Sequence, residues 1–201
     1  MNDSIPLNIV VMLEKECENQ ATESRQLILR KNRSETLLHI VLKILAYIYF
    51  WDHKEDLVVE PGYRFRRFKP DLISFRESEI PGISEPRAVD TWIECKNVKI
   101  DKLLKLSRYL PNCGIYWFNT VNFFQQFLDT FRKKKLKIKS NVHLIGVKIE
   151  PKFLEQLYSS LYSRKVSWKF IKSNNKLILY DMEKVDEAIS VQFDNTVEEH
   201  E

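Results

Sequence analysis

The stretch that decides the fold reads Thr91-Trp92-Ile93-Glu94-Cys95-Lys96. Trp92 and Ile93 predict a buried strand, yet Glu94 and Lys96 each carry a full charge. Side chains two residues apart project from the same face of a strand, so the Glu94 carboxylate and the Lys96 ammonium should point to one place. Charges on an inner strand cost several kcal/mol unless they are paired or bind a metal. Such a conflict between burial and charge is typical of a functional site.

A second stretch upstream supplies another charge. The sequence Phe68-Lys69-Pro70-Asp71-Leu72-Ile73-Ser74-Phe75 holds the only Pro-Asp pair of the chain. Asp71 therefore stands at the start of an otherwise apolar strand. The acid-x-Lys spacing of Glu94 and Lys96 is not specific by itself, because it recurs at residues 52–54 and 150–152 in loop-like sequence. The strand context and Asp71 together set the central triplet apart.

Length and composition indicate a soluble globular protein. The 201 residues are 44% apolar and 30% charged, which suits one domain with a sizeable core. The longest apolar run, residues 44–51, is far shorter than the ~20 residues of a membrane span, and residues 1–4 lack the features of a secretory signal. We therefore expect a cytoplasmic location without a membrane partner. Cys17, Cys95 and Cys113 have no metal-ligand spacing and are expected to be reduced, with Cys95 in the core.

Charge is distributed unevenly along the chain. Residues 95–140 hold eleven Lys and Arg against two Asp, whereas residues 181–201 hold eight acids against one Lys. A basic middle beside an acidic tail favours an anionic partner. An ordinary solvated surface explains the same pattern about equally well. Residues 192–201 are expected to be a disordered acidic tail that follows a single domain over residues 1–191.

Hydrophobic periodicity predicts the remaining elements. A buried helix should begin after Ser34, its expected N-cap, with Glu35 in the first turn, where the helix dipole favours an anion. The other expected helices cover residues 101–110, 121–131 and 151–162. Strands are expected at residues 7–13, 26–30, 57–60, 63–68, 71–75, 115–118 and 142–149, with a final hairpin of 166–171 and 176–180. The strand, helix and strand over residues 91–118 predict a parallel crossover.

Basic residues mark candidate contacts to nucleic acid. Arg64, Arg66, Arg67 and Lys69 alternate with aromatic residues in the expected hairpin, and Lys99 and Lys102 begin the helix after the central strand. Guanidinium groups bind phosphates in a bidentate manner, so this surface suits DNA. A half-exposed hairpin with basic residues outward is an equal alternative.

The order of these elements and charges resembles the core of the PD-(D/E)XK nuclease superfamily. The matching residues are Pro70-Asp71, Glu94-Cys95-Lys96 and Glu35 in the preceding helix. The order of elements over residues 26–180 is also similar to the YaeQ family, which has a variant of that fold. The resemblance implies an α/β fold: a restriction-endonuclease-like core with a mixed central sheet flanked by helices, plus N-terminal and C-terminal hairpins. The YaeQ pattern often lacks the triplet lysine, whereas this chain keeps Lys96.

The residue types also suit hydrolysis of a phosphodiester bond. Mg²⁺ (or Mn²⁺) prefers oxygen ligands, and Asp71 and Glu94 would supply two carboxylates. The resemblance adds the backbone carbonyl of Cys95 as a third ligand. Lys96 would orient the metal-bound water and stabilise developing negative charge. Glu35 would hold a second metal or an outer water.

Three alternatives stay open besides a Mg²⁺-dependent endonuclease acting on DNA. The charged trio can be a buried ion-pair network without metal. The chain can also be a catalytically silent module that keeps the nuclease fold and binds nucleic acid or a protein partner. The third alternative is an interaction protein whose acidic tail folds back on the basic helix. A homodimer is compatible with the resemblance, because many nucleases that cut both strands are dimers.

Overall fold

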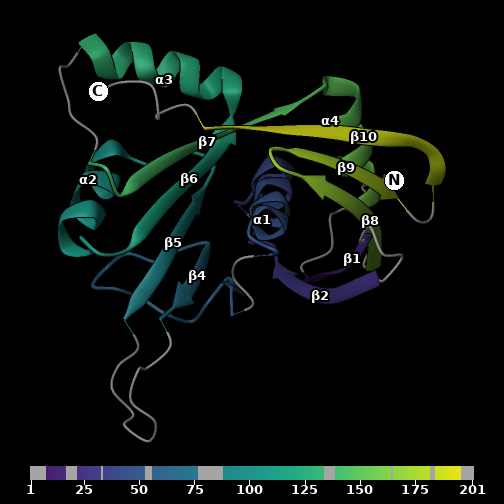
Figure 1. Cartoon of the computed structure of the whole chain (residues 1–201), viewed down its shortest axis with the longest axis horizontal. Helices are drawn as coiled ribbons and strands as arrows, with labels where there is room; N and C mark the ends of the chain where they lie inside the picture. Colours follow the sequence, from purple (N-terminus) through teal and green to yellow (C-terminus); the bar gives the residue numbers. More distant parts are fainter. Residues whose placement is uncertain are drawn as a thin grey trace, which may run out of the picture. The chain divides into compact units, whose positions relative to one another are not determined.

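A computed structural model describes residues 8–16, 22–32, 34–52, 56–76, 88–133, 139–163, 165–181 and 184–195 (Figure 1). The chain forms two compact units. The terminal unit comprises Met1–Val41 and Val147–Asp194, and the central unit comprises Leu42–Gly146 and Asn195–Glu201. The mixed α/β class expected from the sequence is confirmed. The division falls inside one helix and two strands, and the single domain expected over residues 1–191 stays a prediction.

The terminal unit is built on five strands in the order β2-β1-β8-β9-β10. Strands β1 (Asn8–Glu16) and β2 (Thr22–Arg30) pair antiparallel and form the predicted N-terminal hairpin. β1 also pairs in parallel with β8 (Lys165–Ser173), which pairs antiparallel with β9 (Lys176–Asp181). The turn of this predicted C-terminal hairpin places Asn174 at φ 49°, a conformation that Asn tolerates. Helix α4 (Pro151–Ser160) begins with a proline at its first turn, as predicted.

The last strand corrects the expected boundary of the acidic tail. β10 covers Lys184–Asn195 and pairs antiparallel with β9, so residues 192–195 belong to a strand. Ile189, Val191 and Phe193 alternate along it and are buried, which is the period-two pattern of a strand with one covered face. Acidic residues on either side, Asp186, Glu187 and Asp194, led the sequence to be interpreted as part of an acidic tail. Residues 196–201 of the expected tail lie outside the described residues.

Helix α1 (Leu37–Tyr49) is buried on almost every side, as its composition predicted. Its cap is Thr36 rather than Ser34, because the Thr36 hydroxyl accepts the backbone N–H of His39 at 3.4 Å. Glu35 therefore precedes the helix and does not lie in its first turn. No helix in the described ranges has the length and apolar character needed to cross a membrane.

The central unit has the strand order β7-β6-β5-β4-β3. β5 (Val89–Cys95) pairs antiparallel with β4 (Leu72–Phe75) and in parallel with β6 (Gly114–Thr120). Helix α2 (Ile100–Tyr109) connects β5 to β6, so the predicted parallel crossover is confirmed. β6 is followed directly by α3 (Val121–Lys133) and then by β7 (Val142–Ile149). The core of the unit gathers large side chains from these elements: Trp92, Leu106, Ile115, Trp117 and Phe124.

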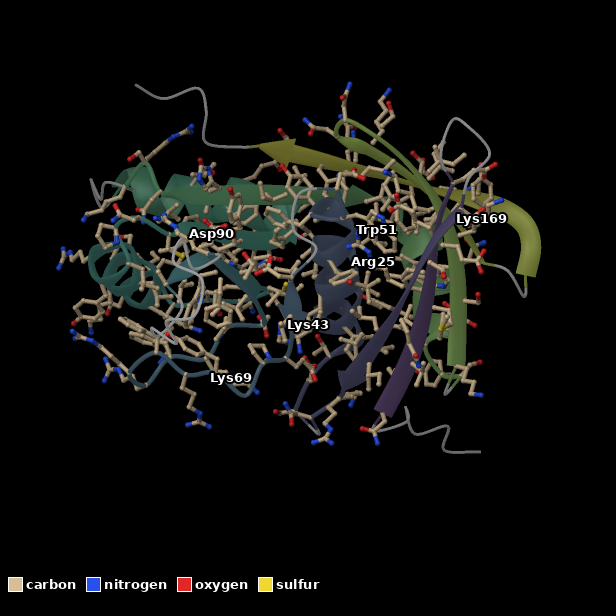
Figure 2. All side chains as sticks on the ribbon, turned by 60° about the horizontal axis from the view of Figure 1, so that its bottom comes forward. Arg25, Lys43, Trp51, Lys69, Asp90 and Lys169 are labelled. Atoms are coloured by element: carbon tan, nitrogen blue, oxygen red, sulfur yellow. The ribbon has the colours of Figure 1, made fainter. Side chains whose placement is uncertain are left out.

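The expected basic hairpin is much shorter than predicted. β3 contains only Val58–Val59, and residues 63–68 form a single bridge between Phe65 and Phe68. Arg66 lies in the turn of this bridge at φ 55°. Figure 2 shows the contrast between two lysines of this unit, with Lys69 reaching outward and Lys43 surrounded by other side chains. Lys69 is exposed and Lys43 is buried.

Candidate active site

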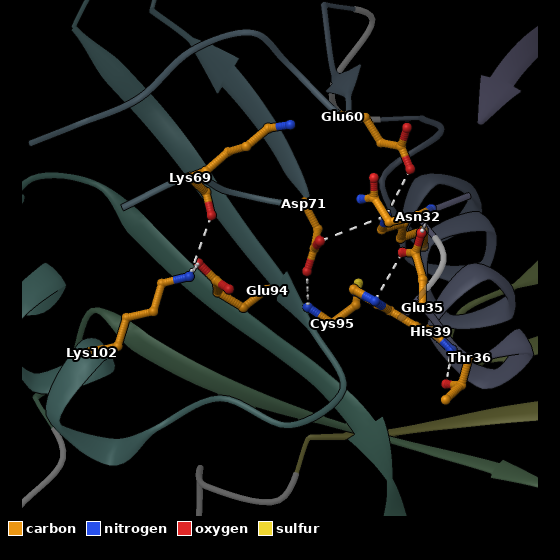
Figure 3. A network of polar contacts seen from close by, with 11 residues as sticks. Asn32, Glu35, Thr36, His39, Glu60, Lys69, Asp71, Glu94, Cys95 and Lys102 are labelled. Atoms are coloured by element: carbon orange, nitrogen blue, oxygen red, sulfur yellow. Dashed lines mark hydrogen bonds and ion pairs between the residues drawn. The ribbon is translucent and has the colours of Figure 1, made fainter. Parts of the chain in front are cut away.

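The β4–β5 pairing brings Asp71 to the end of β5 that carries Glu94. Leu72 pairs with Ile93, and the Asp71 N–H donates to the Ile93 carbonyl at 3.0 Å. The Asp71 carboxylate then accepts the Cys95 N–H through Oδ2 at 2.8 Å (Figure 3). A side chain thus replaces the next backbone carbonyl of the ladder. The Pro70-Asp71 pair and the central strand are brought together as the sequence predicted.

A lysine that the sequence analysis did not select lies beside Asp71. The Lys43 ammonium is 2.7 Å from Glu60 Oε1 and 3.8 Å from Asp71 Oδ1. The Glu60 N–H donates to the Asp71 carbonyl at 2.8 Å, which fixes the two acids side by side. Lys43 is only 3% exposed, and a single charge inside the apolar run of α1 was the signal that could have identified it.

Glu94 is a buried carboxylate with two donors at one oxygen. Its Oε1 accepts the Trp92 Nε1–H at 2.7 Å and lies 2.5 Å from the Lys102 ammonium. Trp92 is two residues away on the same strand, so the shared strand face explains the first contact. Burial raises the pKa of Glu94 to about 7, the Lys102 ammonium opposes this rise, and the Asp71 carboxylate adds to it. The two carboxylates therefore repel each other in a poorly solvated place.

The raised pKa of Glu94 predicts that stability falls with increasing pH. In the unfolded chain this pKa is near 4.5, so the folded state holds the proton more tightly. The contribution is fully present below pH 4.5 and is lost as the pH rises through about 7. With divalent metals chelated, we expect this group to lower the free energy of unfolding by on the order of 3 kcal/mol across that window.

Urea denaturation of wild type and Glu94→Gln at a series of pH values isolates this contribution, because every other titrating group is common to both proteins. Glu155→Gln, at an exposed position on α4, is the matched control and should follow the wild type. Parallel pH curves for wild type and Glu94→Gln would contradict the assignment.

Lys96 lies just beyond the end of the strand that carries Glu94. β5 ends at Cys95, and Lys96 follows in a left-handed conformation with φ 65°. Its N–H donates to the Phe118 carbonyl at 2.8 Å, and its own carbonyl accepts the Trp117 indole N–H. The two-residue alternation therefore stops before Lys96, and the lysine that pairs with Glu94 is Lys102.

Glu35 belongs to the terminal unit and has contacts to its neighbours in sequence. It is 9% exposed, lies 2.9 Å from His39 Nδ1 and accepts the Asn32 N–H at 3.2 Å. These contacts give Glu35 a local structural role before α1. Its predicted role at a second metal stays a prediction.

A pocket of about 490 Å³ opens beside Glu94. Its lining joins cationic side chains to the buried acid: Arg67, Phe68, Glu94, Asn97, Val98, Lys99, Asp101, Lys102 and Lys105. Three of the predicted contacts to nucleic acid, Arg67, Lys99 and Lys102, are brought together in it. Lys105 completes the cationic set and was not selected from the sequence, although it lies one helical turn after Lys102.

The other predicted contacts lie outside this pocket lining. Arg64, Arg66 and Lys69 are exposed. The Arg66 guanidinium stacks over the Tyr109 ring at 3.7 Å from its centroid, a cation–π contact that presents both groups at the surface. In Figure 3 the Lys69 side chain extends away from Glu94, whereas its backbone carbonyl accepts a hydrogen bond from Lys102 at 3.3 Å.

The donor set suits a hard divalent cation. Asp71 and Glu94 supply carboxylate oxygens, and Mg²⁺ commonly uses one or two carboxylates while keeping several waters. Within the described ranges no group of three or more His, Cys, Asp or Glu side chains converges on a metal position. Cys95 would contribute only its backbone carbonyl to such a metal site, and its side chain is buried in the core as predicted.

Comparisons with known proteins agree with this fold. No protein family matches the sequence, and none of the curated proteins matches it. Solved structures do match, and two of them are YaeQ proteins. The YaeQ protein from Xanthomonas axonopodis pv. citri superposes with a TM-score of 0.61 at 14% identity, covering 93% of this chain and 96% of that protein. The YaeQ protein from Pseudomonas syringae gives 0.62 at 18% identity, covering 92% and 94%.

The chain is therefore a mixed α/β protein with a hairpin at each end of its sequence and a strand–helix–strand crossover in its central unit. More narrowly, it has the fold of the YaeQ proteins. At these identities the likeness concerns the fold alone.

Proposed function

We propose that the protein is a metal-dependent endonuclease that hydrolyses phosphodiester bonds in DNA, on a restriction-endonuclease-like core of the PD-(D/E)XK kind. The observation that carries the proposal is a pair of neighbouring carboxylates: Asp71, directly before β4, accepts the Cys95 N–H next to Glu94 on β5, and its charge acts on Glu94. Two neighbouring acids, one of them buried and raised in pKa, gain from a shared divalent cation.

Asp71 and Glu94 would hold Mg²⁺ or Mn²⁺, with the Cys95 carbonyl as a further ligand. When bound, the metal supplies charge neutralisation at the phosphoryl group and lowers the pKa of its water. The Cys95 N–H holds the Asp71 carboxylate, and the Trp92 indole N–H holds that of Glu94. Both acids are thus oriented before any ligand arrives, which limits reorganisation during the reaction.

The cationic side chains would bind the DNA backbone. Arg67, Lys99 and Lys105 line the pocket beside Glu94, where a phosphate next to the cleaved bond would lie. Arg64, Arg66 and Lys69 would extend this contact over the neighbouring exposed surface. Lys96 directly follows the site, and its proposed role in orienting the attacking water is tested by Lys96→Gln, which should lower the cleavage rate while DNA affinity stays within about twofold.

Purified protein should cut DNA in the presence of Mg²⁺ or Mn²⁺ and lose this activity when EDTA is added. Restoring the metal in excess of EDTA should restore cleavage, because the metal supplies the charge that the acids alone cannot. Gel analysis of linear, circular and single-stranded DNA measures the outcome and the substrate preference. Cleavage that is unchanged by EDTA would contradict the proposal.

A second candidate is a catalytically silent module that binds nucleic acid. The observation that favours it is that each carboxylate already has an ammonium partner, Lys43 at Asp71 and Lys102 at Glu94. Such a protein would bind DNA with a steep dependence on salt, and EDTA would not alter the affinity. Binding without cleavage across several DNA structures and metals would select this candidate.

A further inference from the structure

Lys102 connects the carboxylate site to the cationic pocket. It is the third residue of α2, its ammonium lies 2.5 Å from Glu94 Oε1, and its side chain is 24% exposed. Glu94 is only 6% exposed in the same pair. Lys102 also lines the pocket together with Lys99, Lys105 and Arg67. One flexible ammonium is thus within reach of a buried acid on one side and an open cationic pocket on the other.

We propose that Lys102 makes metal binding depend on a bound phosphate group: without a phosphate it occupies Glu94, and with one in the pocket it turns to that phosphate and leaves Glu94 to the metal. This inference rests on the proposed nuclease function and adds an order to its binding steps. It concerns phosphate groups of nucleic acid, which the cationic lining of the pocket would recognise.

Charge in the pocket supports this exchange. Among the described residues, no ion pair is formed by Arg67, Lys99 or Lys105, whereas Lys102 is paired with Glu94. A phosphate entering the pocket would meet three cations without carboxylate partners and attract the fourth. Lys102 also donates to the Lys69 carbonyl at 3.3 Å, and its ammonium is carried on a flexible four-carbon stem that can change contacts.

The exchange is an energetic coupling between two ligands, and such coupling is reciprocal. A phosphate that removes Lys102 from Glu94 raises the affinity for the metal, and the metal raises the affinity for the phosphate by the same factor. Coupling of this kind commonly changes affinity by about 5–150-fold. The site would then bind metal firmly only when nucleic acid is present.

Mn²⁺ titration of the full-length protein, followed by electron paramagnetic resonance of the free ion, tests the coupling. Inorganic sulfate serves as a tetrahedral dianion, with chloride at matched ionic strength as reference, and a short oligodeoxynucleotide provides a second arm. We expect sulfate and the oligonucleotide to tighten Mn²⁺ binding by at least about fivefold. An effect of the oligonucleotide alone would assign the coupling to the nucleic acid backbone rather than to a free dianion.

The variant Lys102→Gln removes the ammonium that competes for Glu94. It should bind Mn²⁺ at least about fivefold more tightly than wild type without any anion, and sulfate should no longer change this affinity. Lys176→Gln is the matched control, since Lys176 is an exposed lysine on β9 in the other unit, and it should behave as wild type.

Three results would overturn the proposal. Wild-type Mn²⁺ affinity that is unchanged or weakened by both anions removes the coupling, and this measurement does not depend on a folded variant. A folded Lys102→Gln protein with unchanged Mn²⁺ affinity removes Lys102 as the competitor. Absence of Mn²⁺ binding in every protein overturns the proposed nuclease function as well, whereas metal-dependent cleavage without coupling overturns only this inference.

Discussion

Replacing Asp71 by Asn should lower Mg²⁺-dependent DNA cleavage by at least about a hundredfold, with the fold intact. The amide oxygen of Asn can still accept the Cys95 N–H, so the junction of β4 and β5 keeps its hydrogen bond. The negative charge is lost, and with it one of the two carboxylates that would hold the metal. The change therefore separates the charge of Asp71 from its structural contact.

Asp56 offers a matched control for this experiment. Its carboxylate accepts the Phe75 N–H at 3.0 Å, so it also bonds the backbone of β4 through a side chain. Asp56→Asn should leave cleavage within about twofold of wild type, since the residue lies away from the paired acids. Cleavage rates are compared at saturating Mg²⁺, with circular dichroism to verify folding. Substantial activity in Asp71→Asn would remove Asp71 from the proposed site.

The sequence placed the acids correctly because both lie where strands could be recognised. Asp71 precedes an apolar run and Glu94 interrupts one, so strand pairing alone brings them together. Lys96 could not be placed in this way. Its φ of 65° is set by the hydrogen bonds that its backbone makes to β6, and no local sequence pattern predicts a lysine in the left-handed backbone conformation.

The ion pairs of Lys43 and Lys102 could not be predicted from the sequence. Each lies on a helix rather than on the strand next to its acid, and only the packing of helix against sheet creates the pairs with Asp71 and Glu94. Helical periodicity considers one helix alone, so it does not predict which residue on a neighbouring strand Lys102 contacts. A long ammonium side chain can nonetheless reach back along the apolar surface to a neighbouring strand. Patterns within an element therefore predict burial better than they predict charge partners.

Replacing Trp117 by Ala should destabilise the protein by about 3–5 kcal/mol, the largest effect on stability that we expect from one substitution. The side chain is fully buried, and its ring centroid lies 5.5, 5.0 and 4.8 Å from those of Phe123, Phe124 and Phe127 on α3. Its removal leaves a cavity between β6 and α3 that these rings cannot fill without leaving their own contacts.

Trp117 also links the core to the proposed site, because it pairs with Glu94 across β5 and β6 and donates its indole N–H to the Lys96 carbonyl. Trp117→Phe keeps an aromatic ring but loses this donor, so it should cost clearly less than the alanine variant and still lower the cleavage rate by loosening the backbone at Lys96. Urea denaturation followed by far-UV circular dichroism measures both free energies of unfolding. If Trp117→Ala costs less than about 1 kcal/mol, the packing of β6 against α3 is not the main support of the site. If Trp117→Phe cleaves DNA at the wild-type rate, the indole hydrogen bond has no part in holding Lys96.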